Sequence, residues 1–264
     1  MATQISHELD RLLPETRFEP TPKRIRAFLG SETVLDSVRA VLFWEPRRVV
    51  PCYAVPIDDV LAVLEPTPRA PEHETAPPAM RVLHPGIPFA AHSCPGLELD
   101  VQAGSARREA AAFRPRDPEL NSYVAFSFNE LSWMEEDEPV ASHPRDPFHR
   151  VDVRASAARV LVTSGSLVLA DSIHPKVVFE THMGPRYYLP PEDVHWQALL
   201  PTSSSTGCAY KGIASYWALA DGEVDVAWSY LSPLPDAAGI ADMVCFYDDR
   251  VQVTVSRGDV PASG

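Results

Sequence analysis

Residues 24–45, RIRAFLGSETVLDSVRAVLFWE, and residues 159–180, RVLVTSGSLVLADSIHPKVVFE, decide the fold, because the second stretch repeats the first at a constant offset of 135. With a one-residue slip, the match continues from CYAVPIDDV (52–60) to YYLPPEDV (187–194). The preserved order indicates an internal duplication. The identical positions are Arg24, Gly30, Ser31, Asp36, Ser37 and Glu45, which correspond to Arg159, Gly165, Ser166, Asp171, Ser172 and Glu180.

Later segments extend the comparison. We align YVAFSF (123–128) with DVAWSY (225–230), and HRVDV (149–153) with DRVQV (249–253). The duplication then predicts three parts, with almost no linker between the repeats. They are a leader with a short helix in residues 1–21, a first, diverged repeat in 22–155 and a second repeat in 157–258. Within the first repeat, the proline-rich stretch 65–88 is typical of an extended surface loop.

The local pattern within each repeat favours strands. Short runs such as ARVLVTS (158–164) and KVVFE (176–180) are rich in β-branched residues, and Gly, Pro and Asp separate them. Residues 56–64 and 190–200 are compatible with a helix, because a proline precedes acidic residues in both. The sequence therefore predicts a mainly β fold: two tandem repeats of a small antiparallel β domain, each with one short helix.

Composition narrows the function classes. The chain has 264 residues and a net charge of −13, which argues against nucleic acids and anionic membranes as partners. No apolar run reaches the length of a membrane span, and the four cysteines are widely scattered. We expect a reduced, cytoplasmic protein without a cofactor. Because a two-repeat chain already has internal pseudo-symmetry, we expect a monomer.

The segment CAYKG (208–212) holds the densest set of reactive side chains. A lysine near a thiol favours the thiolate, so Lys211 and Cys208 are candidate catalytic residues. The first repeat has a cysteine in the comparable HSCPG (92–96) but no lysine, which places any active pocket in the second repeat. The alternative is that Cys208 is a small buried apolar residue and Lys211 a structural cation.

Two acidic residues of the second repeat are further candidates for a site with CAYKG (208–212). Glu180 ends an apolar strand, where a carboxylate can act as a general base, or it can pair with Arg186 or Lys211. Asp193 is a candidate ligand-binding residue, or a helix N-terminal acid. His143 and His149 lack a third ligand for a metal, so no metal site is predicted. For them we expect interdomain hydrogen bonds, with the acidic run 135–138 facing Arg145 or Arg150.

Aromatic side chains concentrate in the second repeat and can line a pocket for a planar or cationic ligand. Strand alternation puts neighbours such as those in ASYWAL on opposite faces, so only some can line one pocket. The alternative is that most of them are core. The candidate ligand-binding aromatics are Tyr188, Tyr210, Trp217 and Trp228.

The second repeat resembles the domain-of-unknown-function 427 family in its tandem form. The resemblance rests on VLADS (168–172), YYLPPEDV (187–194), CAYKGIASYW (208–217), AWSYLSPLPDAAGI (227–240) and CFYDDRV (245–251). The first repeat matches the tandem family through YVAFSF, WMEEDEP (133–139) and HPRDPFHRVDV (143–153). The resemblance implies a compact, β-tent-like fold and no established reaction. Some collections label the family nucleotidyltransferase-like.

Three functions follow as hypotheses. The first is a pocket in the second repeat for a small molecule of unknown identity, either binding or catalytic. The second is a non-enzymatic interaction module that uses the 65–88 loop and the acidic run 135–138. The third is a nucleotidyltransferase, which needs paired carboxylates for Mg²⁺. The nearest alternating acids are Glu223 and Asp225, in an expected turn.

Overall fold

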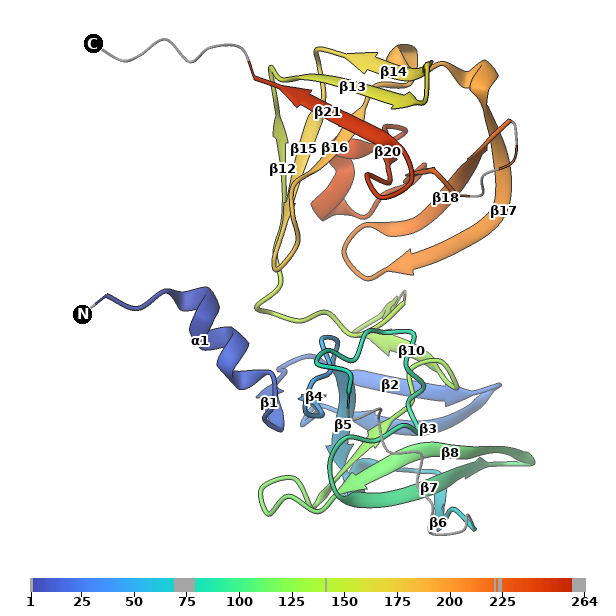
Figure 1. The fold of residues 1–264 in the computed structure, drawn as a ribbon. Coiled ribbons are helices and arrows are strands. Elements are labelled where there is room, and N and C mark those ends of the chain that lie inside the picture. Colours follow the sequence, from blue (N-terminus) through green and yellow to red (C-terminus); the bar gives the residue numbers. More distant parts are fainter. Residues whose placement is uncertain (1, 69–78, 141, 221, 223–224, 258–264) are drawn as a thin grey trace. The chain divides into compact units, whose positions relative to one another are not determined.

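The structure is a computed structural model that describes residues 2–68, 79–140, 142–220, 222 and 225–257. The chain divides into two compact units, Met1–Asp146 and Pro147–Gly264. Antiparallel strands dominate both, which confirms the predicted mainly β class (Figure 1). The predicted leader helix is α1, Ile5–Leu12, and it buries none of its side chains.

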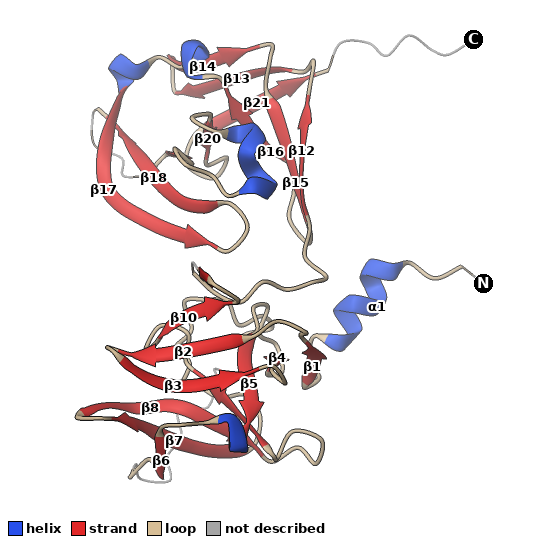
Figure 2. Cartoon of the chain, turned by 180° about the vertical axis from the view of Figure 1, so that it is seen from behind, coloured by secondary structure: helices blue, strands red, loops and turns tan. Residues whose placement is uncertain are grey.

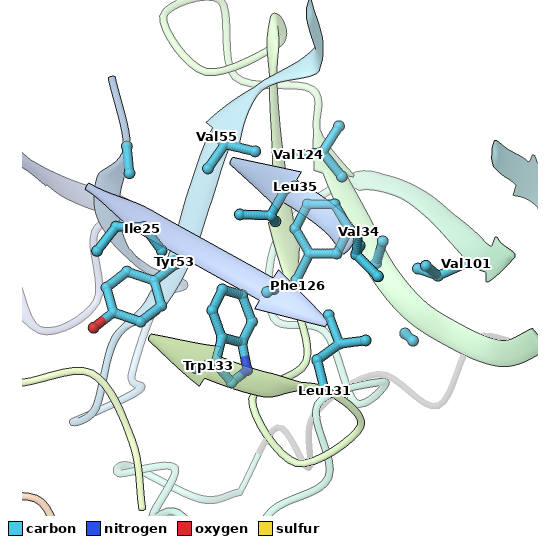
Figure 3. Packing of buried hydrophobic residues seen from close by; sticks show 14 of the residues in the cluster. Ile25, Val34, Leu35, Tyr53, Val55, Val101, Val124, Phe126, Leu131 and Trp133 are labelled. Carbon is cyan, nitrogen blue, oxygen red and sulfur yellow. The ribbon is translucent and has the colours of Figure 1, made fainter. Parts of the chain in front are cut away.

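The first unit contains a seven-stranded and a four-stranded sheet. The larger sheet has the order β1 (Arg17–Pro20), β4 (Val41–Trp44), β5 (Cys52–Pro56), β9 (Tyr123–Phe126), β8 (Ala106–Pro115), β7 (Gly96–Ala103) and β6 (Val63–Pro66). The smaller sheet has the order β11 (Glu138–Pro139), β10 (Ser132–Glu135), β2 (Ile25–Leu29) and β3 (Glu32–Ser37). The main core of the first unit lies between these two sheets and includes Tyr53, Phe126 and Trp133 (Figure 3).

The second unit repeats this arrangement. Its seven-stranded sheet has the order β12 (Val151–Ala155), β15 (Lys176–Glu180), β16 (Arg186–Leu189), β20 (Val244–Phe246), β19 (Ala227–Ser229), β18 (Gly212–Leu219) and β17 (Leu199–Cys208). The three-stranded sheet has the order β14 (Leu167–Ser172), β13 (Arg159–Ser164) and β21 (Gln252–Ser256). Strand by strand, both sheets follow the order of the first unit, except that β11 has no counterpart among the described residues.

The two hairpins that the offset of 135 relates, β2–β3 and β13–β14, also agree in local detail. The β2–β3 hairpin has a register shift after Ala27, and the β13–β14 hairpin has one after Val162. Gly30 and Gly165 turn the two hairpins with φ of 63° and 57°, values that favour glycine. Each hairpin also carries a two-point guanidinium–carboxylate pair, formed by Arg24 with Asp36 and by Arg159 with Asp171.

Beyond residue 60 the structure places segments differently from the sequence alignment. By position in the sheet, β9 corresponds to β20, whereas the alignment paired residues 123–128 with 225–230. Strand β12 pairs with β15 inside the second unit, although the alignment assigned residues 149–153 to the end of the first repeat. The insertions in the first repeat break the constant offset, so local similarity alone misled the alignment.

The expected helices shrink to short 3₁₀ turns. They are η1 (Ile57–Asp59) in the first unit and η2 (Pro191–Asp193) and η3 (Trp196–Ala198) in the second. The expected helix spans 56–64 and 190–200 were therefore too long. Val60 and Val194 end the first turn of each unit by bridging back to Leu35 and Ala170. The second unit has a further 3₁₀ helix, η4 (Pro235–Ile240).

The proline-rich stretch 65–88 is only partly a surface loop. Residues 69–78 of it lie outside the described part of the chain. Pro66 belongs to β6, and Leu83 is fully buried and forms a bridge with Arg48. The end of this insertion is therefore part of the first unit's packing.

The large sheet of the second unit buries residues on both faces. One face packs against β13, β14 and β21 through residues such as Leu189 and Phe246. The opposite face carries an aromatic cluster, over which η4 packs with Ala237 and Ile240 (Figure 2). Strand alternation therefore sorts the candidate aromatics of this unit onto two separate faces.

Candidate functional site

A buried carboxylate anchors the candidate site of the second unit. Glu180 ends β15, and its Oε1 lies 3.0 Å from Nε2 of His149. Lys211, in the turn between β17 and β18, donates from Nζ to Oε2 of Glu180. The side chains of Lys211 and Glu180 are 10% and 9% exposed, so the ion pair is largely removed from water. The ring of His149 stacks on Tyr210 with centroids 4.3 Å apart.

The surroundings of Glu180 keep it ionised. Burial alone raises the pKa of this carboxyl, but the hydrogen bond from His149 and the charge and hydrogen bond of Lys211 outweigh burial and hold the pKa below its usual value. Because a carboxylate only accepts, His149 carries a proton on Nε2, and in its neutral form Nδ1 is the basic nitrogen. The cluster can thus present a fixed cation and an oriented imidazole.

An aromatic row runs across the sheet next to this cluster. Lys176, Tyr188, Cys245, Trp228 and Tyr216 are successive cross-strand partners. The Tyr188 hydroxyl accepts a hydrogen bond from Nε1 of Trp228 at 3.0 Å. Burial raises the pKa of Tyr188 well above its usual value, so this phenol stays neutral.

Tyr230 lies on the same face, and its ring centroid is 6.5 Å from that of Tyr188. Burial raises its pKa, and the neighbouring Cys208 and Glu180 add to the shift. Cys208 is partly exposed and packs against the same aromatic cluster. Tyr230 and Cys208 therefore belong to the same cluster as the aromatic row.

The structure gathers most of the predicted residues and separates two. Cys208, Lys211, Glu180, Tyr188 and Trp228 belong to one face, and Tyr210 joins them through its stacking on His149. The other two lie elsewhere.

Trp217 packs against the core between the two sheets and contacts Trp196. Asp193 lies in η2, which follows β16 beyond the pairing of Tyr188 with Lys176. It is thus at the opposite end of β15 from Glu180.

Sequence reasoning did not place His149 in this site. The alignment put residues 149–153 at the end of the first repeat, whereas the pairing of Val151 with Glu180 brings His149 to the end of β15. A correct register for β12 is the signal that would have found it. Of the two partners considered for Glu180, Lys211 is correct, and Arg186 instead pairs with Asp248.

Glu45, the counterpart of Glu180 in the first unit, is buried away from solvent. The side chain of Glu45 is 1% exposed and accepts from the Ser93 amide at 2.6 Å. His92 Nδ1 lies 3.0 Å from Glu45 and Arg48 Nε lies 3.4 Å away. Burial raises the pKa of the neighbouring Cys94 thiol to about 12. This glutamate is packed by its own unit on all these sides.

A cleft of about 320 Å³ opens in the second unit, away from the Glu180 cluster. It lies on the other face of the large sheet, next to β13 and β21. The predicted lining residues and this cleft are therefore different places in the same unit. Its lining includes Val160, Val162, Arg186, Tyr187, Leu189, Cys245, Phe246, Asp248, Val253 and Val255.

The acidic run 135–138 is bound within the first unit. Glu135 pairs with Lys23, Asp137 lies 3.1 Å from Arg26, and Glu136 accepts from the backbone amide of Arg24. Within the second unit, Arg150 pairs with Asp152, and its expected contact with this run stays a prediction. The run thus offers less free charge to a partner than its sequence suggests.

Other function classes gain no support from the described residues. Asp225 accepts hydrogen bonds from the hydroxyls of Thr202 and Ser204, and Glu223 lies outside the described residues. In the part of the chain that the structure describes, no three His, Cys, Asp or Glu side chains converge to hold a metal ion. Within the same residues, no helix has the length and apolar character of a membrane span.

Comparison with known proteins concerns mainly the second unit. No curated protein matches the chain. A family model does match, over the stretch from β12 to the end of β21 that contains Glu180, Cys208 and Lys211. The matching model is described as a domain of unknown function, DUF427, and it covers residues 152–257.

Proposed function

We propose that the second unit binds a small molecule at the Glu180 cluster, and that the aromatic face beside it forms one wall of the site. The observation that carries the proposal is the shared carboxylate: Glu180 holds Lys211 and His149 at once. Binding sites combine apolar walls with a few placed polar groups. Six of the eight residues selected from the sequence belong to this cluster or to the aromatic face beside it, which supports the proposal.

The groups suggest a division of roles. Lys211 supplies a fixed positive charge for an anionic group of the ligand. Glu180 is ionised and engaged by two partners, so a proton would move through Nδ1 of His149, with Glu180 as its orienting partner. In a catalytic version of the site, Cys208 is the nucleophile, since its side chain is partly exposed on the same face.

We further propose that the first unit is a diverged copy of the same domain, so that the chain is a tandem pair. The shared strand order, the two equivalent register shifts and the two equivalent arginine–aspartate pairs support a common origin. In this copy Glu45 is buried under Ser93 and His92. The first unit then serves stability, and the second unit carries the site.

Native mass spectrometry of protein purified without added ligand tests the site. We expect a non-covalent excess mass that disappears in the double variant Glu180→Gln/Lys211→Met, which removes both charges together. The control Lys23→Met removes a lysine that pairs with Glu135 in the first unit, and it should keep the adduct. An adduct that survives in the double variant would place the ligand elsewhere. Loss of the adduct on deleting residues 70–80 would favour the interaction module.

A further inference from the structure

The cleft of the second unit lies between its two sheets. Val160 and Val162 on β13 and Val253 and Val255 on β21 form one wall, and Leu189 and Phe246 form the other. Arg186, Tyr187 and Asp248 also line it. Its volume of about 320 Å³ is at the lower end of the range of small-molecule sites.

In the first unit a tryptophan occupies the equivalent position. Trp133 faces Ala27 across β10 and β2, and Val253 faces Val162 across β21 and β13. Ala27 and Val162 are equivalent at the offset of 135, so Val253 stands where the first unit has Trp133.

The Trp133 indole is buried in an aromatic stack. Its ring lies 5.1 Å from Tyr53 and stacks on Phe128 at 5.8 Å with an interplanar angle of 7°. Figure 3 shows the indole among Tyr53, Leu131 and Phe126. The same fold therefore accommodates a bicyclic aromatic ring at this place.

The second aromatic ring of that stack is also replaced. Tyr188 pairs with Cys245 as Ala54 pairs with Ala125, so β20 is in register with β9. In this register Phe246 corresponds to Phe126. Two residues further along each chain segment, Asp248 corresponds to Phe128. The second unit thus lacks two of the three rings of the stack, those of Trp133 and Phe128, and the cleft is located there.

The lining of the cleft carries exchangeable charge. Arg186 donates to Asp248 at 2.6 Å, and the two side chains are 31% and 65% exposed. Arg257 donates to the Tyr187 hydroxyl at 3.2 Å. A ligand carboxylate can take the place of an exposed aspartate on a guanidinium, because the paired geometry is the same.

We propose that this cleft binds a planar aromatic carboxylate of about indole size. The ring takes the place that Trp133 fills in the first unit, and the carboxylate pairs with Arg186 in place of Asp248. This site lies on the face of the large sheet opposite the Glu180 cluster, and it is independent of the function proposed there.

Indole-3-acetate is the probe, with indole and octanoate as comparisons, and NMR shifts and calorimetry report binding. We expect indole-3-acetate to bind more tightly than either comparison. Val253→Trp should fill the cleft and weaken binding by more than about tenfold. Arg186→Gln should weaken the binding of indole-3-acetate and leave the binding of indole unchanged. The matched control Arg154→Gln, on an exposed β12 residue, should change neither.

Three results would overturn the proposal: no binding of indole-3-acetate at millimolar concentration, equal binding by Val253→Trp, or octanoate binding as tightly as the aromatic acid. Because Val253→Trp can fail to fold, Trp133→Val gives an independent test in the first unit. It should open a cavity that binds indole, as apolar cavities do. Failure of that variant to gain indole binding would contradict the equivalence of the two positions.

Discussion

Glu45 and Glu180 lie 135 residues apart, at the same position of their two units, and each accepts a hydrogen bond from a histidine and lies beside a cation. The histidine of the first unit comes from the loop before β7, and that of the second from the segment before β12. The fold thus keeps the buried carboxylate while its partners come from different parts of the chain. A position that requires a charge in both units is consistent with a structural role as well as a binding role.

Removing only one partner of the Glu180–Lys211 ion pair should destabilise the second unit. In Lys211→Met the buried Glu180 loses its cation, and we expect the free energy of unfolding to fall by about 3–5 kcal/mol. Urea unfolding followed by circular dichroism measures the change. The double variant Glu180→Gln/Lys211→Met should recover most of the loss, and Lys176→Met should stay within about 0.5 kcal/mol of the wild type. Equal losses in the single and double variants would contradict a coupled pair.

Stability should depend on pH through Glu180. Its pKa in the folded state lies below the ordinary value of a glutamate, so the ionised form is the one that folding favours. The resulting stabilisation is complete above the unfolded pKa and is lost as the pH falls through the lower, folded value. We expect the urea concentration at which half of the protein is unfolded to decrease as the pH is lowered from 5 to 3.

The variant Glu180→Gln isolates this contribution to the pH dependence. Other carboxyls with lowered pKa values, such as Asp171 and Asp248, remain in both proteins and contribute equally to both curves. The difference between the two curves therefore belongs to Glu180. Parallel curves over this pH range would show that its pKa is not lowered by folding.

The hairpin glycine at 165 gives a test of backbone geometry alone. Its φ is +57°, and a Cβ built there has nothing within 4 Å, so Gly165→Ala introduces strain without a clash. We expect a loss of about 1 kcal/mol, and a smaller loss for Gly165→Asn. Gly184 also has free space around it but an ordinary φ, so Gly184→Ala should leave stability unchanged or slightly higher. Equal effects of the two alanine variants would argue against the left-handed conformation at residue 165.

The constant offset predicted more of the structure than the strand pattern did. Gly30 and Gly165 turn equivalent hairpins, and the paired Arg159 and Asp171 repeat Arg24 and Asp36. These features depend on contacts within about fifteen residues, so identical residues produce the same local geometry. The mainly β class followed from the same short-range signals.

Long-range partners were harder to derive. Insertions in the first repeat shift the offset, so the alignment of residues 123–128 fell on β19 when β20 is their counterpart. His149 was missed because its approach to Glu180 depends on the register of β12 with β15. Strand alternation did predict that Tyr216 and Trp217 lie on opposite faces, and for that reason Trp217 is separated from the other candidates.

The aromatic face has its own measurable signature in the hydrogen bond between Trp228 and Tyr188. Tyr188→Phe removes the acceptor and leaves the largely buried indole N–H without this partner, which should cost about 1–3 kcal/mol. The control Tyr187→Phe removes a hydroxyl that bonds the exposed Arg257, so we expect a change within about 0.5 kcal/mol. In a double-mutant cycle with Trp228→Phe, the effects should be non-additive, because the second substitution removes the same bond. Additive losses would mean that the two side chains stabilise the face only through packing, and that the hydrogen bond contributes nothing.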